Sequence, residues 1–143
     1  MGAEAVLRRR RAERAALIAR GQTFAQGLSA ELQVRAVVLH GSVARGDFNV
    51  WSDVDVLVVA DALPERFLDR LDALAPWPPR IQPVAWTPAE WRQRSARRDP
   101  IAVTVCRHGV WLAGAPEDLA EDAPTPEEKS QPPRQTSSPS EGR

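Results

Sequence analysis

Cysteine is almost absent from this 143-residue chain, since Cys106 is the only one. An intrachain disulfide is therefore impossible, and a metal site built from several thiolates is excluded. Cys106 itself lies in an apolar run, so we expect it to belong to the core. Long apolar runs are also missing, because the nearest, residues 54–60, is interrupted by Asp55 and is far too short to span a bilayer. No apolar stretch of signal-peptide length follows the basic N-terminus, and we expect a cytoplasmic protein without a membrane segment.

A net charge is lacking too, because 19 basic side chains balance 19 acidic ones. The balance hides an uneven distribution, with a mildly basic body over residues 1–114 and an acidic segment over residues 115–143. A mildly basic body suits a polyanionic ligand such as a nucleotide but is too weakly charged to indicate binding to duplex nucleic acid. The arginines at 8–11 cover every side of a helical turn, so we expect them to be mostly solvated.

Residues 115–143 contain too few large apolar side chains to form a hydrophobic core. After Leu119 no Val, Ile, Leu, Phe or Trp occurs, and prolines stand among Ser, Glu, Gln and Thr. Such a segment buries too little apolar surface to order itself, so we expect a disordered C-terminal tail. The rest of the chain divides into a helical segment over residues 1–34, expected to pack on the core, and a domain over residues 35–114.

Patterns of apolar residues predict helices alternating with strands before the tail. Residues 4–20 favour a helix, although Gly21 and Gly27 leave its continuation open. Buried-strand patterns occupy residues 35–40 and 53–60. A helix is predicted over 65–74, after Pro64. The apolar residues at helical spacing in it are Phe67, Leu68, Leu71 and Leu74.

The back half of the domain continues this alternation. Residues 80–86 favour a third strand, which Pro83 confines to an edge or a bulge of the sheet. Thr87 and Pro88 are typical of a helix start, as N-cap and first helical residue. Residues 101–108 fit a helix or a strand, and residues 110–112 predict a short closing strand. Strands alternating with helices indicate an α/β (α+β) domain.

A turn between the first strand and a short helix contains Gly41 and Ser42. Glycine lets a backbone approach a phosphate closely, and a serine hydroxyl and free helix-end amides can donate to its oxygens. Alone, this dipeptide is a weak signal, because Gly-Ser pairs are common in ordinary turns. His40 precedes it and is interpreted as a packed strand-end histidine.

The next strand begins with two carboxylates, Asp53 and Asp55. Residues two apart in a strand point to the same face, about 6.6–6.8 Å apart, so both acids project together while Val54 and Val56 point into the core. Two like charges raise each other's pKa unless a cation lies between them. Mg²⁺ commonly combines one or two carboxylates with the phosphates of a substrate. In isolation such a pair can also be a solvated strand end.

The two elements together form a coherent site for a nucleoside triphosphate. The sequences GSVARG at 41–46 and SDVDVLVV at 52–59 resemble the DNA polymerase β-like nucleotidyltransferase superfamily, and among its members the minimal nucleotidyltransferases. The resemblance covers roughly residues 35–114. It implies a small mixed β-sheet flanked by helices, like the polymerase β palm, and a transferase that uses Mg²⁺ or Mn²⁺ and ATP.

The resemblance also assigns roles to individual residues. Gly41 and Ser42 become binders of the nucleotide phosphates, and Asp53 and Asp55 become catalytic metal ligands. Arg45 is a further candidate for phosphate binding through its guanidinium, with a solvated helix face as the alternative. The five tryptophans can offer a base-stacking surface or, by default, pack in the core.

The sequence departs from the family pattern at its third acidic position. Active members usually carry another carboxylate on the next strand, and residues 80–86 contain no acid. Gln82 is the expected occupant of that position, and an amide cannot accept a proton. Asp47 and Glu90 are the alternatives that could compensate. Nucleotide binding is therefore better supported than catalysis.

Two functions from different classes remain open. The first is an enzyme that transfers a nucleoside monophosphate, most naturally AMP from ATP, to a hydroxyl of a protein or small acceptor. The second is a catalytically weak or inactive nucleotide-binding module that acts as the antitoxin-like partner of a HEPN-domain protein, as the family resemblance implies. An RNA-binding protein using the arginines at 8–11 is a third, less favoured reading.

Overall fold

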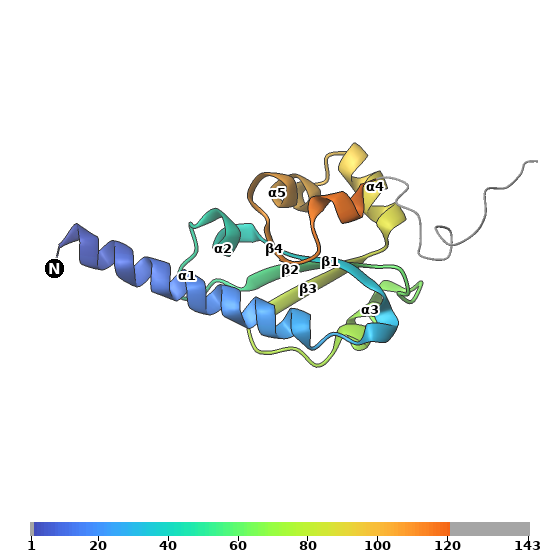
Figure 1. Cartoon of the computed structure of the whole chain (residues 1–143), viewed down its shortest axis with the longest axis horizontal. Helices are drawn as coiled ribbons and strands as arrows, with labels where there is room; N and C mark the ends of the chain where they lie inside the picture. The colour runs from blue at the N-terminus through green and yellow to red at the C-terminus, as the bar shows by residue number, and fades with distance from the viewer. Residues whose placement is uncertain (1, 121–143) are drawn as a thin grey trace, which may run out of the picture.

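The computed structural model describes residues 2–120 of the chain and shows a sheet covered by helices on both faces (Figure 1). Within this range the sheet has four strands in the order β3-β2-β1-β4. β1 pairs antiparallel with β2 and with β4, whereas β2 and β3 run parallel. The predicted small mixed sheet flanked by helices is confirmed. The strands are β1 (Val34–His40), β2 (Val54–Ala60), β3 (Ile81–Trp86) and β4 (Val110–Ala113).

The helices alternate with these strands along the chain. The α-helices are α1 (Ala3–Gln26), α2 (Gly41–Arg45), α3 (Phe67–Leu74), α4 (Pro88–Ala96) and α5 (Pro100–His108). Two short 3-10 helices are η1 (Ala30–Leu32) and η2 (Pro116–Leu119). In the part of the chain that the structure describes, no helix combines the length and apolar character needed to cross a membrane.

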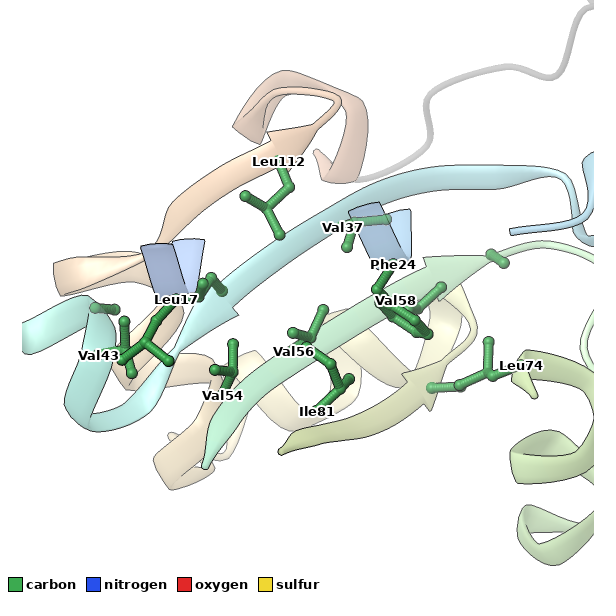
Figure 2. Close-up of a cluster of buried hydrophobic side chains, with 14 of the residues drawn as sticks. Leu17, Phe24, Val37, Val43, Val54, Val56, Val58, Leu74, Ile81 and Leu112 are labelled. Carbon is green, nitrogen blue, oxygen red and sulfur yellow. The ribbon is translucent and has the colours of Figure 1, made fainter. Parts of the chain in front are cut away.

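The core lies in two clusters, one on each face of the sheet. On the first face, Leu17 and Phe24 of α1 pack over alternate residues of β2, as Figure 2 shows. On the second face, Trp91 of α4 and Val105 of α5 cover Leu57 and the remaining alternate strand residues. Because strand residues alternate in direction, each face of β2 buries its own set. This alternation decides which face the polar residues of β2 share.

Helix α1 continues without a break past Gly21, which the sequence left open. A Cβ at Gly21 would lie 3.0 Å from Leu112 Cδ1 and 3.3 Å from Leu39 Cδ1. The missing side chain therefore lets α1 approach β1 and β4 closely, and packing against the sheet outweighs the low helix propensity of glycine. The N-terminal turns of α1 run out past the sheet (Figure 1).

Local sequence signals explain the positions of β3, α4 and α5. β3 lies at the edge of the sheet, where a strand tolerates Pro83, as predicted. Thr87 caps α4 by accepting from the Glu90 backbone N–H, with Pro88 as the first helical residue. Residues 100–108 form a helix because Asp99 accepts from the Ile101 N–H at 2.9 Å and so caps its start.

Three details differ from the sequence predictions. α3 begins at Phe67 instead of residue 65, and of its four apolar residues only Leu74 is buried. Cys106, expected in the core, is exposed, because it lies on the outer side of α5. In the segment assigned to the tail, η2 packs Leu119 into the core with 4% of its surface exposed. The rest of that predicted tail, residues 121–143, lies outside the described residues.

Candidate nucleotide and metal site

The turn from β1 into α2 brings backbone and carboxylate together. Gly41 has a φ of 78°, a conformation that L side chains rarely adopt. A Cβ at this position would lie 3.0 Å from Asp55 Cγ and would collide with Asp55 Oδ2. Glycine is therefore required here for two reasons. Its φ is positive, and the backbone passes directly over a carboxylate of β2. The predicted phosphate-binding turn and the predicted acidic strand meet at this point.

The two aspartates lie at the start of β2. Asp53 is exposed just before the strand and Asp55 is half-buried within it. Val54 and Val56 are fully buried against α1, so both acids point to the opposite face. Burial raises the pKa of Asp55, the charge of Asp53 raises it further, and the charge of Arg45 opposes the shift. Asp55 is thus a carboxylate whose ionised form a cation would stabilise.

Three residues that pair across neighbouring strands form a row through Asp55. His40 of β1 pairs with Asp55 of β2, and Asp55 pairs with Gln82 of β3. Gln82 is exposed and stands next to Asp55 in the strand register. That it occupies the third acidic position of the family pattern stays a prediction. Its amide can offer a carbonyl oxygen but no negative charge and no proton acceptor.

Neither of the other two acids, Glu90 and Asp47, is grouped with Asp53 and Asp55 into a metal cluster in the described part of the chain. Glu90 lies beyond the far end of β3, where it accepts from Arg70 Nη1 at 2.7 Å and from the Thr87 N–H at 2.9 Å. Burial alone would raise the pKa of Glu90, but these hydrogen bonds and the Arg70 charge lower it. Asp47 is exposed and pairs with Arg45 at 3.2 Å. Within residues 2–120, no three His, Cys, Asp or Glu side chains are grouped so as to hold a metal ion.

His40 is buried beside the acids, with 6% of its surface exposed. Its Nε2 has no hydrogen-bond partner among the described residues. Burial, and to a smaller extent the nearby Arg45 charge, lower the pKa of His40 to about 4. The imidazole is therefore neutral at pH 7, as expected for a packed strand-end histidine.

The loop before the acids presents an exposed tryptophan. Trp51 has 86% of its surface exposed, whereas Trp86 and Trp91 pack against each other with ring centroids 6.2 Å apart. The Trp51 N–H donates to Asn49 Oδ1 at 2.8 Å, and the Asn49 N–H donates to Ser52 Oγ at 2.9 Å. These bonds hold the backbone of the turn. Because the Trp51 side chain is exposed, packing in the core does not explain a tryptophan at this position.

Two arginines that no sequence motif pointed to contact α2 and the loop that follows it. Arg10 and Arg14 of α1 donate to backbone carbonyls in and just after α2. Arg10 was grouped with a solvated arginine run, and that interpretation is wrong for this side chain. The signal was the spacing, because residues 10, 14, 17, 21 and 24 follow one stripe of the helix.

Comparison with known proteins identifies the family. The sequence matches the model of the nucleotidyltransferase domain over residues 22–97, more than half of the chain. The chain therefore belongs to the nucleotidyltransferase domain family, as the motif predicted, and its features are those of a minimal nucleotidyltransferase. A search of curated proteins found no match.

Two solved structures resemble this chain to different degrees. A protein of Sulfolobus solfataricus assigned as a nucleotidyltransferase superposes with a TM-score of 0.52 at 16% identity, covering 71% of this chain and 84% of its own. A toxin–antitoxin structure with AMP-PNP gives a TM-score of 0.41 at 16% identity, covering 68% of this chain and 77% of its own. At such identity the first likeness concerns the fold alone.

Proposed function

We propose that this protein binds ATP and Mg²⁺ at the turn Gly41–Ser42 and the pair Asp53 and Asp55. It then transfers AMP to a hydroxyl group of a protein or small acceptor. The observation that carries the proposal is the contact between Gly41 and Asp55, since a side chain at residue 41 would fill the space over the carboxylate. A phosphate cradle and an acidic pair in contact are what a metal-bound triphosphate requires. The proposed location is the cytoplasm.

The donor set fits one Mg²⁺ shared between the protein and phosphate oxygens. Asp53 and Asp55 would hold it, because their charges face the same side of β2 and, among the described residues, no ion pair reaches the half-buried Asp55. When bound, the ion would supply charge neutralisation at the phosphates and lower the pKa of a coordinated hydroxyl. Two carboxylates support one such ion better than the pair that a complete triad would hold.

The proposed reaction balances without another reagent. The acceptor hydroxyl oxygen forms a bond to the α-phosphorus of ATP, the bond between that phosphorus and the bridging oxygen breaks, and pyrophosphate leaves. The hydroxyl proton must pass to water or to phosphate, because Gln82 cannot take it. Loss of a general base typically costs about 10²–10⁴-fold in rate, so we expect slow turnover. Arg45 at the end of α2 is positioned to contribute charge to the same site.

A label-transfer assay tests this function. The protein is incubated with α-labelled ATP, Mg²⁺ or Mn²⁺ and candidate acceptors, including a HEPN-domain protein. Asp53→Asn and Asp55→Asn should each abolish transfer and weaken ATP binding in the presence of metal by at least about tenfold, because the metal loses a charged ligand. Asp72→Asn removes an exposed carboxylate on α3, away from the pair, and is the matched control. Transfer that survives both substitutions would sink the proposal.

Gln82→Glu tests whether the third position limits catalysis. The substitution places a carboxylate beside Asp55 in the register of β2 and β3. We expect transfer to rise by about 10²-fold or more, since a proton acceptor is restored. Gln93→Glu, on α4, adds the same charge elsewhere and should leave the rate unchanged. Equal rates for Gln82→Glu and the unsubstituted protein would show that position 82 does not limit the reaction.

The same row of residues favours a second candidate, a binding module without turnover. With no acid at position 82, the site retains the features for holding a nucleotide and lacks one for transferring it. In this form the protein would act as the antitoxin-like partner of a HEPN-domain protein. ATP binding without label transfer to any acceptor, in both the original chain and Gln82→Glu, would favour this candidate.

A further inference from the structure

Two arginines of α1 hold the C-terminal end of α2. Arg14 Nε donates to the Val43 carbonyl at 2.8 Å, and its Nη2 donates to the Ala44 carbonyl at 3.0 Å. Arg10 Nη1 and Nη2 donate to the carbonyls of Phe48 and Gly46, at 2.8 Å and 3.0 Å. The Arg10 guanidinium also stacks over the Phe48 ring, 4.0 Å from its centroid. Four hydrogen bonds and one stacking contact thus join α1 to α2 and the loop that follows.

These bonds complete the backbone hydrogen bonding of a very short helix. The last carbonyls of a helix have no partner within it, and in a five-residue helix this concerns most of them. The Ser42 carbonyl accepts from the backbone N–H groups of Gly46 and Asp47. The carbonyls of Val43 and Ala44, which lie in a buried stretch, receive their donors from α1. Without Arg14, these two carbonyls would lose the donors that fix their position.

The donors are themselves fixed, because α1 is anchored on the sheet. Further along the stripe that carries Arg10 and Arg14, Leu17 and Phe24 are buried in the core and Gly21 permits close packing on β1 and β4. Figure 2 shows Leu17 close to Val43 and Val54, so α2 and the start of β2 meet the same turn of α1. A rigid helix therefore sets the place of α2 relative to the strand that carries Asp55.

We propose that Arg10 and Arg14 are positioning residues of the nucleotide site, which hold α2 so that Gly41 and Ser42 stay over the carboxylate of Asp55. This inference rests on the proposed function for the identity of the ligand. The arginines act through the backbone, since their guanidinium groups are committed to carbonyls of α2 and its loop. Arg45, at the end of α2, is instead the arginine whose charge acts on Asp55. The N-terminal half of α1 thus becomes part of the site.

Amide hydrogen exchange and ATP affinity, measured together on the full chain, test the inference. The variants are Arg10→Ala, Arg14→Ala, and Arg14→Lys, which keeps a donor able to reach one carbonyl. Arg11→Ala is the matched control, because Arg11 is exposed on the same helix and lies off the stripe. ATP with Mn²⁺ is the probe for affinity, and exchange is compared between residues 41–48 and the amides of β1 and β2.

We expect faster exchange confined to residues 41–48 in both alanine variants, with ATP affinity reduced roughly 10–100-fold, the usual effect of losing an outer positioning contact. Arg14→Lys should recover part of both effects, and Arg11→Ala should show neither. Exchange raised equally over β1 and β2 would mean a general structural role and would overturn the inference. So would local exchange without loss of affinity. If the unsubstituted protein binds no ATP, the proposed function fails, and exchange alone decides whether the arginines hold α2.

Discussion

The charged residues at the two ends of the sheet are paired to different extents. At the end away from the site, Arg70 is buried and pairs with Glu90 at 2.7 Å, and Arg35 pairs with Asp61 at 3.0 Å. At the site end, the aspartates at 53 and 55 share one face, and within residues 2–120 no ion pair reaches either of them. One end is held by ion pairs, and the other has two neighbouring negative charges whose repulsion Arg45 opposes only in part.

The difference separates charges that build the fold from charges available to a ligand. Arg70 donates to the carbonyls of Pro64 and Ala85 as well as to Glu90, so it ties α3, β3 and α4 together. Nothing comparable restrains Asp55, whose raised pKa reflects burial and the neighbouring Asp53. We therefore expect substitutions at the far end to cost stability, and substitutions at the site end to affect binding more than folding.

The largest loss of stability is predicted for Arg70→Met. Removing one partner of a buried ion pair leaves the other charge uncompensated and typically costs 3–5 kcal/mol. Because Glu90 is partly exposed, we expect about 3 kcal/mol at pH 7, measured by urea unfolding followed through tryptophan fluorescence. Arg66→Ala is the control, since its pair with Asp69 is exposed and 4.0 Å long, and it should cost at most about 0.5 kcal/mol. Equal losses in the two variants would contradict the comparison.

A smaller loss is predicted for Gly41→Ala at the site end. The positive φ and the collision with Asp55 together should cost about 2–3 kcal/mol in unfolding free energy, and ATP binding should be lost. Gly46→Ala separates the two causes, because Gly46 has a φ of 93° and no atom within 4 Å of the added Cβ. It should cost about 1–2 kcal/mol from backbone strain alone.

Adding Asp55→Ala to each glycine variant completes this test. The cost of Gly41→Ala should then fall to that of Gly46→Ala, because the colliding carboxylate is gone. A cost that stays the same would show that the two residues are not in contact.

The smallest effect on stability at neutral pH is predicted for His40, and this effect grows as the pH falls. Its pKa of about 4 in the folded protein lies below the unfolded value of 6.5, so the unfolded chain binds the proton more readily. This histidine should therefore cost no stability above pH 6.5, and an increasing amount as the pH falls from 6.5 toward 4. In His40→Gln, unfolding midpoints in urea should fall less over that interval. His108→Gln, at the exposed end of α5, should behave like the original chain.

Much of this molecule follows from local sequence signals. Pro83 predicted an edge strand, Thr87 and Pro88 predicted the start of α4, and the alternation around Asp55 predicted two buried valines and two acids on one face. These features depend on neighbouring residues, and local rules are sufficient for them. The family motif at 41–59 is equally local, so the sequence alone indicates the family.

The features that escaped prediction depend on tertiary contacts. Arg10 looked like a member of a solvated run, because its acceptors are backbone carbonyls 36 and 38 residues away. Phe67 and Leu68 had the spacing of a buried helix face, yet α3 meets the sheet through Leu74 and Arg70 and leaves them exposed. The neighbour of Asp55 on β3 could be named as Gln82, but only the strand register places the two side by side.

The contact between α1 and α2 changes which segment of this protein must be kept together. The match to the nucleotidyltransferase domain begins at residue 22, inside α1 and after both Arg10 and Arg14. A fragment cut at that boundary would keep every residue of the recognised motif and lose the two side chains that hold α2. The domain defined by sequence similarity is therefore shorter than the segment that we expect to be needed for a working site.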